Sequence, residues 1–380
     1  MMFTFIFFIL LRYYILIGNN EVKSSAIEII KHWGYENSTR KKSEKKKNKP
    51  VVFLQHGLLG SSADWLINLP NQSAGFIFAD SGFDVFLGNV RGNTYSTEHA
   101  SLNVNLKEYW NFSLDEMVKY DLDAMINKVL EISGQDYLYY IGYSQGTLIM
   151  FSKLSLNTNL TKKIRQFHAL APVGTVGHIK GPLYYISKFF NNKEFLIELI
   201  FGQKNFLSNN WSSSIFKNLF CKNPITNNFC NNIYFTFTGK NSKQLNNSNI
   251  NNIFKIFPAD TSIKNMIHWS QMINSGSQQM YNYEYGQLNT KYYGQTTPPI
   301  YNISNINVNT YLYWGNNDYL VNPQDIINNL INKIKPNFLK ANFMYKDFNH
   351  LDFVWGLRAS SEVYKTIIIN IKNDLKNISF

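Results

Sequence analysis

A series of short, mostly apolar runs constrains the fold of this chain more than any other feature. They cover residues 50–56, 82–88, 137–141 and 167–172. Runs of this length and apolarity are typical of strands buried on both faces of a parallel sheet. Between the second and third runs, residues 114–132 carry apolar positions at helical spacing and stop at Ser133-Gly134. Strands that alternate with helices predict an α/β fold whose mostly parallel central sheet has helices on both faces.

The alternation is interrupted from residue 173 to residue 299. This stretch is rich in aromatic residues and asparagine, has only patches of helical spacing, and contains both cysteines of the chain. Strand-like runs return at residues 311–315 and 342–345. We therefore predict a core in two parts, residues 26–172 and 300–380, with an inserted, mainly helical cap between them.

The sequence Gly142-Tyr143-Ser144-Gln145-Gly146 ends one predicted strand and precedes a predicted helix. In a G-x-S-x-G motif with this context, the serine lies on a sharp, strained turn that exposes its hydroxyl. Gly142 and Gly146 leave room where strand and helix crowd each other. The first amides of the new helix point toward negative charge that develops at the serine. We predict that Ser144 is a nucleophile.

A serine hydroxyl needs a histidine to take its proton and an acid to orient that histidine, in the chain order Ser, Asp or Glu, His. The histidines that follow Ser144 are His168, His178, His268 and His350. We interpret His168 as a packed residue of a strand, and His178 and His268 as parts of the cap. His350 lies in a loop between the last strand and a final helix, where catalytic residues of such sheets are found, and is the predicted base.

The predicted acid is Asp318, which follows the strand at residues 311–315. Asp325 lies close by, but its position at the start of a predicted helix is explained by capping. Asp352 is too near His350 in sequence to reach the far side of its ring.

The oxyanion hole is expected to use the N–H after the nucleophile, which is that of Gln145, and one from the loop after an early strand. That loop is Gln55-His56-Gly57-Leu58-Leu59-Gly60, and we predict the Leu58 amide as the donor. Gly57 lets the backbone turn its amide toward the site. We interpret His56 as holding the loop.

Several motifs together resemble the acid lipase family, which includes gastric lipase and lysosomal acid lipase. The matching segments are residues 50–59, Asp64-Trp65, 68–70, 88–93, 115–117, 119–122, 142–147, 257–259, His268-Trp269, 323–325 and 349–353. The resemblance runs from about residue 26 to the C-terminus. It implies an α/β-hydrolase fold, the triad Ser144, Asp318 and His350, and Leu58 and Gln145 as oxyanion donors.

The resemblance also implies neutral lipid esters, triacylglycerols or sterol esters, as substrates, with the cap acting as a lid. It places the cap disulfide at Cys221 and Cys230. The chain departs from the family where a strand hairpin is usual, between Trp33-Gly34-Tyr35 and Val51. Only the lysine-rich stretch 37–49 stands there, which predicts an unpaired sheet edge.

Two other functions fit parts of this pattern. An esterase for short, soluble esters would use the same three residues, but a small substrate does not need a large aromatic cap. A catalytically silent lipid-binding homologue would keep the pocket, but it would be favoured by a replaced triad residue, and no triad residue is replaced. The sequence therefore favours a lipase that acts at a lipid–water interface, with no cofactor and no metal.

The N-terminus and the cysteines indicate export. Residues 1–18 are mostly apolar, and the uninterrupted run before Arg12 is too short to span a bilayer, so we predict a signal peptide or a signal anchor. In an exported chain the two cysteines are expected to form a disulfide. Glycosylation sequons begin at Asn37, Asn71, Asn111, Asn159, Asn210, Asn246, Asn302 and Asn377. We expect a secreted or lysosome-like location.

The net charge of +12 has no recognisable nucleic-acid motif to go with it. Part of the charge lies in the basic run at residues 40–49, which is typical of a solvated segment. No nucleic-acid partner is predicted, and no membrane span beyond the N-terminal segment.

Overall fold

A central sheet of seven strands organises the molecule. The computed structural model describes residues 9–10, 49–156, 159–191, 193–206, 237–240, 242–246, 249–276 and 279–378. The strand order is β1-β3-β2-β4-β5-β8-β9, and all neighbours pair parallel except β1, which is antiparallel to β3. The strands are β1 Ile9–Leu10, β2 Val51–Gln55, β3 Asp84–Gly88, β4 Leu138–Tyr143, β5 Ile164–Leu170, β8 Asn309–Gly315 and β9 Leu339–Tyr345.

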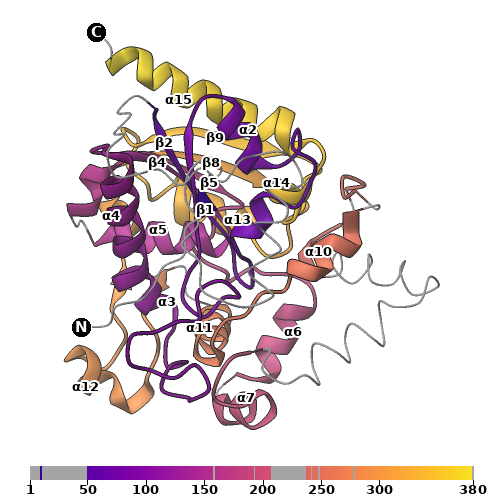
Figure 1. Ribbon diagram of the computed structural model, residues 1–380. Helices are drawn as coiled ribbons and strands as arrows, with labels where there is room; N and C mark the ends of the chain where they lie inside the picture. Colours follow the sequence, from indigo (N-terminus) through magenta and orange to yellow (C-terminus); the bar gives the residue numbers. More distant parts are fainter. Residues whose placement is uncertain are drawn as a thin grey trace.

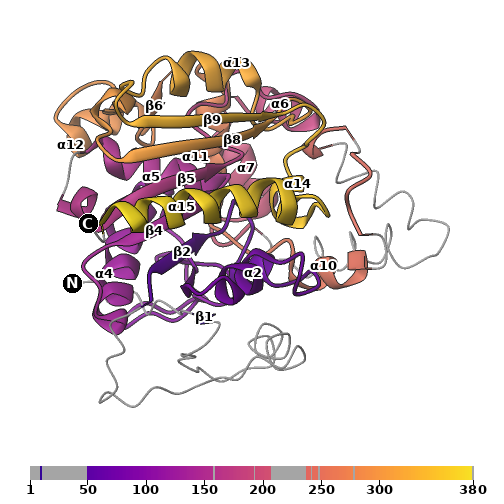
Figure 2. The ribbon, with the colours of Figure 1, turned by 90° about the horizontal axis from the view of Figure 1, so that it is seen from above.

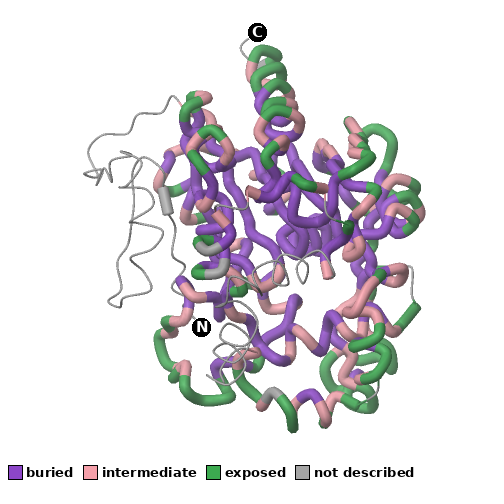
Figure 3. Tube along the Cα trace, turned by 90° about the vertical axis from the view of Figure 1, so that its right-hand side faces the viewer, coloured by how far each residue is buried: buried purple, intermediate pink, exposed green. Residues whose placement is uncertain are grey.

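Burial along the strands explains why their sequences look as they do. Every residue of β2, β3 and β4 is buried, because helices cover both faces of the sheet there. In β9, at the other end of the sheet, half-buried and exposed residues alternate, as an edge strand with one covered face allows. Figure 3 shows this concentration of buried residues in the sheet, with the exposed segments mainly at the periphery.

Helices form layers on either side of the sheet. Figure 1 shows α15 (Lys365–Ile378) and α2 (Ala74–Asp80) at the top, with α4 (Leu122–Ser133) and α5 (Gln145–Ser155) lower down. In Figure 2 α15 runs across the sheet. Short helices α13 (Pro323–Ile326) and α14 (Asp352–Trp355) follow β8 and β9. The predicted α/β architecture, with a mostly parallel central sheet and helices on both faces, is confirmed in this arrangement.

The predicted helix at residues 114–132 is nearly correct in its bounds. It consists of α3 (Leu114–Glu116), a π-helical turn (Met117–Asp121) and α4. Ser113 caps its start in a capping box with Glu116, and Gly134 ends it in the left-handed region at φ 68°.

The segment between β5 and β8 contributes no strand to the central sheet among its described residues. It forms α6 (Pro182–Phe189), α7 (Glu194–Phe201), α10 (Ile250–Ile256), α11 (Ile263–Asn274) and α12 (Asn289–Tyr293). A small antiparallel pair, β6 (Met280–Tyr281) with β7 (Ile300–Tyr301), crosses the predicted boundary at residue 299. Figure 1 shows α6, α7, α11 and α12 at the bottom of the molecule. We call this segment, residues 171–308, the inserted segment.

Several predictions fall outside the described residues. Cys221 and Cys230 lie within 207–236, and the lysine-rich stretch lies almost wholly within 11–48. Of the predicted signal, the structure describes only Ile9–Leu10, which pair with Leu87 and Phe86 of β3. The prediction that this sheet edge is unpaired is therefore wrong at these two residues, because the N-terminal segment supplies a short antiparallel strand. Among the helices that the structure describes, none has the length and apolarity needed to cross a bilayer.

Candidate active site

Ser144 lies on the turn that joins β4 to α5. Its backbone has φ 51° and ψ −119°, a combination that residues other than glycine rarely adopt. The turn is held because Ser144 donates its N–H to the carbonyl of Leu170 at 3.0 Å, and its own carbonyl accepts from the Thr147 hydroxyl at 2.7 Å. The strained turn points the serine away from the strand, as the motif predicts.

The two glycines of the motif are required by close packing. A Cβ on Gly142 would lie 2.9 Å from the carbonyl of Gly146, and one on Gly146 would lie 2.6 Å from the carbonyl oxygen of Gln55. Real Cβ atoms do not approach backbone this closely, so the turn would have to open. Gly142 and Gly146 therefore let β2, β4 and α5 meet at the serine.

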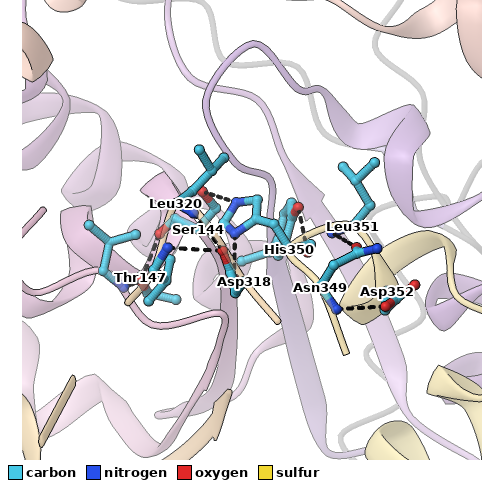
Figure 4. Close-up of polar contacts among 11 residues, drawn as sticks. Ser144, Thr147, Asp318, Leu320, Asn349, His350, Leu351 and Asp352 are labelled. Atoms are coloured by element: carbon cyan, nitrogen blue, oxygen red, sulfur yellow. Dashed lines mark hydrogen bonds and ion pairs between the residues drawn. The ribbon is translucent and has the colours of Figure 1, made fainter. Parts of the chain in front are cut away.

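Ser144, His350 and Asp318 form a continuous chain of hydrogen bonds (Figure 4). The His350 Nε2 atom is 2.9 Å from Ser144 Oγ, and its Nδ1 atom is 2.8 Å from Asp318 Oδ2. When Nδ1–H donates to the carboxylate, Nε2 is left as the acceptor for the serine proton. The three residues are 2–5% exposed, so water does not compete for these bonds. The structure thus brings together the three residues that the sequence analysis selects.

The parallel sheet explains how residues so far apart in sequence meet. Ser144 follows β4, Asp318 follows β8 and His350 follows β9, and the carboxyl ends of parallel strands meet at one edge of a sheet. Asp318 is held from behind, because its Oδ1 accepts the N–H groups of Leu320 and Val321 at 2.8 and 2.9 Å. These bonds hold the carboxylate in the orientation that lets its other oxygen meet the His350 ring.

The predicted oxyanion loop runs beside the nucleophile. A Cβ on Gly57 would lie 3.0 Å from Ser144 Cβ, so the backbone at Leu58 is a near neighbour of the serine. The Gln145 N–H is the first of α5 and has no acceptor within its helix. Among the described residues, neither the Leu58 nor the Gln145 N–H donates to a backbone carbonyl. Both remain available to a negatively charged oxygen.

His56 supports that loop, as the sequence analysis proposed. Its Nδ1 is 2.8 Å from the Gly57 carbonyl, and its Nε2 accepts the Val90 N–H at 3.2 Å. Burial lowers the pKa of His56 to about 4, so the ring is neutral and serves as a fixed bridge between two loops.

His168 and His268 also have structural partners. His168 is fully buried in β5 and lies 3.1 Å from the Tyr313 hydroxyl and 3.0 Å from Gln166 Oε1. Burial lowers its pKa to about 3. His268 Nε2 lies 3.0 Å from the carbonyl of Tyr281 in β6. These contacts agree with the predicted packing roles.

The interpretation of Asp325 as a helix cap is wrong. Asn322 caps α13, because its side chain accepts the Gln324 N–H. Asp325 instead binds a loop of the inserted segment: it accepts from the Thr175 hydroxyl at 3.1 Å and from the His178 N–H at 2.9 Å. It also lies 2.8 Å from the ring nitrogen Nδ1 of His178. Asp325 therefore anchors the loop of residues 175–178, and His178 is one of the residues it binds.

Asp352 makes no bond to the His350 ring. Its Oδ2 accepts the Asn349 N–H at 2.7 Å (Figure 4), and its Oδ1 accepts from Ser242 of the inserted segment at 2.7 Å. Burial raises the pKa of Asp352 to about 6.

One supporting element of the site has no counterpart in the sequence motifs. The carbonyl of Thr238 accepts the N–H of His350 at 3.2 Å and that of Tyr319 at 3.3 Å, and Gly239 pairs with Asp318 in an isolated bridge. Residues 237–240 of the inserted segment thus join the loop that carries the acid to the loop that carries the base. Backbone bonds such as these leave no residue pattern, so no sequence signal could have revealed them.

No group of three or more His, Cys, Asp or Glu side chains in the described part of the chain could hold a metal ion. What the site offers is a nucleophile with a base, an oriented acid and free amides, which suits acyl transfer.

Comparisons with known proteins agree with this geometry. A family model described as the alpha/beta hydrolase fold matches residues 50–208. Lipase lipl-1 of Caenorhabditis elegans is 45% identical over 332 residues, which are 87% of this chain and 82% of the relative. Human gastric triacylglycerol lipase is 38% identical over 381 residues, and the match covers 94% of each chain. Mouse lipase member K is also 38% identical, over 95% of this chain and 94% of its own length.

The solved structure of a Sulfolobus solfataricus protein has a TM-score of 0.53 over 86% of both chains, at 14% identity. An epoxide hydrolase from Vigna radiata has a TM-score of 0.50 and is 12% identical, over 86% of this chain and 92% of its own. At these identities the likeness concerns the fold. The family is shown by the relatives of high identity. This chain belongs to the acid lipases of the α/β-hydrolase fold, the carboxylic ester hydrolases that include gastric lipase.

Proposed function

We propose that this lipase hydrolyses neutral lipid esters, triacylglycerols or sterol esters, through an acyl-enzyme on Ser144. The observation that carries the proposal is the unbroken path from Ser144 Oγ through the His350 ring to Asp318, with links of 2.9 and 2.8 Å. A buried chain of this kind activates a hydroxyl for attack on an ester carbonyl.

The reaction follows from the positions of these groups. Ser144 Oγ attacks the carbonyl carbon while His350 Nε2 takes its proton, and Asp318 stabilises the imidazolium that forms. The Leu58 and Gln145 N–H groups hold the oxyanion of the tetrahedral intermediate. His350 then gives its proton to the leaving alcohol. A water molecule then gives a proton to His350 Nε2 as its oxygen attacks the acyl carbon, and the fatty acid leaves as Ser144 Oγ takes that proton back.

An exposed apolar surface on the inserted segment supports a lipid–water interface as the place of action. On α6, Tyr185 and Phe189 are 72% and 61% exposed, and on α7, Phe195 and Leu199 are 72% and 67% exposed. Side chains of this size are costly to leave in water and cluster at sites that meet lipid or protein. Lys188 and Lys193 lie over rings of the same surface, as cation–π pairs with Tyr184 and Phe189.

Secretion or delivery to a lysosome-like compartment is part of the proposal. The apolar N-terminus and the cysteine pair of the sequence support it. The sequon asparagines Asn71, Asn111, Asn159, Asn302 and Asn377 are exposed, as glycosylation requires. Intact mass before and after glycosidase and reduction would test the glycans and a Cys221–Cys230 disulfide together.

Labelling with a fluorophosphonate probe tests the nucleophile. We expect the purified protein to be labelled and the Ser144→Ala variant to remain unlabelled. A folded wild-type protein that is not labelled would contradict the proposed function and favour a catalytically silent lipid-binding homologue.

The substrate class needs a second measurement. We expect a higher kcat/KM for emulsified long-chain triacylglycerol or sterol ester than for a soluble butyrate ester, because the apolar surface of α6 and α7 serves only an aggregated substrate. A preference for the soluble ester would identify the protein as a short-chain esterase.

A further inference from the structure

Two residues of α11 hold the side chain of Gln145. The Gln145 Oε1 atom accepts from Trp269 Nε1 at 2.7 Å and from Asn265 Nδ2 at 3.0 Å. An indole nitrogen can only donate, so the atom that faces Trp269 must be the amide oxygen. Gln145 is 2% exposed, which means that its oxygen has no water to replace these donors.

Helix α11 is itself firmly placed. Asn265 and Trp269 are four residues apart and therefore project from the same face of the helix. Ser262 caps α11 by accepting the Asn265 N–H at 3.0 Å, and its hydroxyl donates to the carbonyl of Phe112, outside the inserted segment. The Asn265 side chain also donates to Thr261 at 3.1 Å. Figure 1 shows α11 below α5, among the helices of the inserted segment.

The position of Gln145 makes these contacts important for chemistry. Its backbone N–H is a proposed oxyanion donor, and it follows a serine whose backbone is strained at φ 51°. A donor of this kind acts only when it lies within about 3 Å of the developing oxyanion, so a small rotation of the peptide weakens it. A side chain fixed at its far end limits that rotation.

We propose that Asn265 and Trp269 are positioning residues for the oxyanion hole. By holding Gln145 Oε1 they fix the direction of the Gln145 N–H, and they make its direction depend on where α11 lies. The inference rests on the proposed function, because it concerns the same hydrolytic site. It adds that the inserted segment takes part in stabilising the transition state.

The test is the Trp269→Phe variant, which removes the indole N–H and keeps an aromatic ring. With a soluble butyrate ester, we expect kcat per site titrated with a fluorophosphonate to fall about 10-fold, part of the loss seen when an oxyanion donor is removed. KM should not change, because the donor acts in the transition state. Counting titrated sites removes any effect of a smaller folded fraction.

Trp110→Phe is the matched control. Its buried indole donates to the carbonyl of Val104 at the same 2.7 Å, and this bond involves neither Gln145 nor its two partners on α11. This variant loses the same kind of bond, and we expect its kcat per titrated site to stay within twofold of the wild-type value.

Two further variants test the route of the effect. Asn265→Leu removes the second donor at similar volume, and we expect a fall in kcat of about the same size. In a Gln145→Met background the acceptor is gone, so adding Trp269→Phe should change kcat by less than twofold.

The outcomes separate the two proposals. A wild-type protein that is not labelled by the fluorophosphonate would overturn the proposed function and this inference with it. A labelled wild-type protein whose Trp269→Phe variant keeps its kcat, or loses no more than Trp110→Phe does, would overturn this inference alone.

Discussion

In the described part of the chain, two histidine–aspartate pairs have the same distance between the ring and the carboxylate. In both His350–Asp318 and His178–Asp325, the Nδ1 atom lies 2.8 Å from a carboxylate oxygen. The pairs differ in their surroundings. The His350 side chain is 5% exposed and has a serine hydroxyl on its other nitrogen, whereas the His178 side chain is 35% exposed and has no recorded partner there among the described residues.

The difference shows what makes such a pair catalytic. The distance between ring and carboxylate is the same in both pairs, so it cannot decide which pair is catalytic. The deciding features are a nucleophile on the second nitrogen and exclusion of water. The Asp325 carboxylate is used to tie Thr175 and His178 of one loop, while Asp318 is fixed by two backbone amides and faces a single histidine.

Replacing the histidines should give the largest difference in kcat between the two pairs. We expect His350→Ala to lower kcat about 10⁵- to 10⁶-fold, the size of loss found when a triad histidine is removed. His178→Ala should leave kcat within twofold. Hydrolysis of a soluble ester by both purified variants, with circular dichroism to verify folding, makes the comparison. Similar losses in both variants would mean that the pairs are equivalent.

Replacing the aspartates should give a smaller separation. Asp318→Asn is expected to lower kcat about 10⁴-fold, because the neutral amide stabilises neither the required tautomer nor the imidazolium. We expect Asp325→Asn to leave kcat within a few-fold and to reduce the free energy of unfolding by about 1–3 kcal/mol, since the loop loses an ionised acceptor. Activity and urea unfolding of the two variants are measured side by side. An Asp325→Asn variant that loses activity and keeps its stability would reverse the assignment.

Asp352, the carboxylate nearest His350 in sequence, should affect stability through pH. Burial raises its pKa to about 6 in the folded protein from an ordinary value of 3.8. Between about pH 4 and pH 6 the folded protein therefore binds a proton that the unfolded chain has lost. The contribution of Asp352 to stability is complete below this window and declines as the pH rises through it.

We expect Asp352→Asn to remove that decline, which is on the order of 2 kcal/mol. Urea unfolding at pH 4, 5, 6 and 7 compares the variant with the wild type. Since Asp352 does not touch the His350 ring, kcat near neutral pH should change by no more than a few-fold. Parallel stability curves for the two proteins would contradict the assigned origin of the pH dependence.

Much of the sheet and of the catalytic chain could be predicted because their signals are local. The apolar run before Ser144, the two glycines around it and the loop positions of Asp318 and His350 are each visible within a few residues. The apolar pattern places the start of β5 at Phe167, three residues after its start at Ile164 in the structure, because Arg165 and Gln166 are polar. In the structure Gln166 is buried against His168, and Arg165 pairs with Asp374 of α15.

The part of the site that could not be predicted consists of contacts between residues far apart in the sequence. Such contacts leave no pattern among neighbouring residues. Trp269 reaches Gln145 across 124 positions, and Asp325 reaches His178 across 147. The pattern around Asp325 predicts a cap because a position near a helix start is a local signal, whereas the bond of Asp325 to the distant loop is not. Such contacts depend on how the inserted segment is placed against the core.

The carbonyl of Thr238 has a consequence for the order in which activity arises during folding. It joins the loops after β8 and β9, and it belongs to a segment made before either strand has been synthesised. The sheet can assemble around β2, β4 and β5 early, but the base and the acid are tied together only when the last strands have been added and residues 237–240 meet them. A nascent or partly folded chain will therefore carry a finished nucleophile turn without its proton acceptor, and its hydrolytic activity will appear only with the final steps of folding.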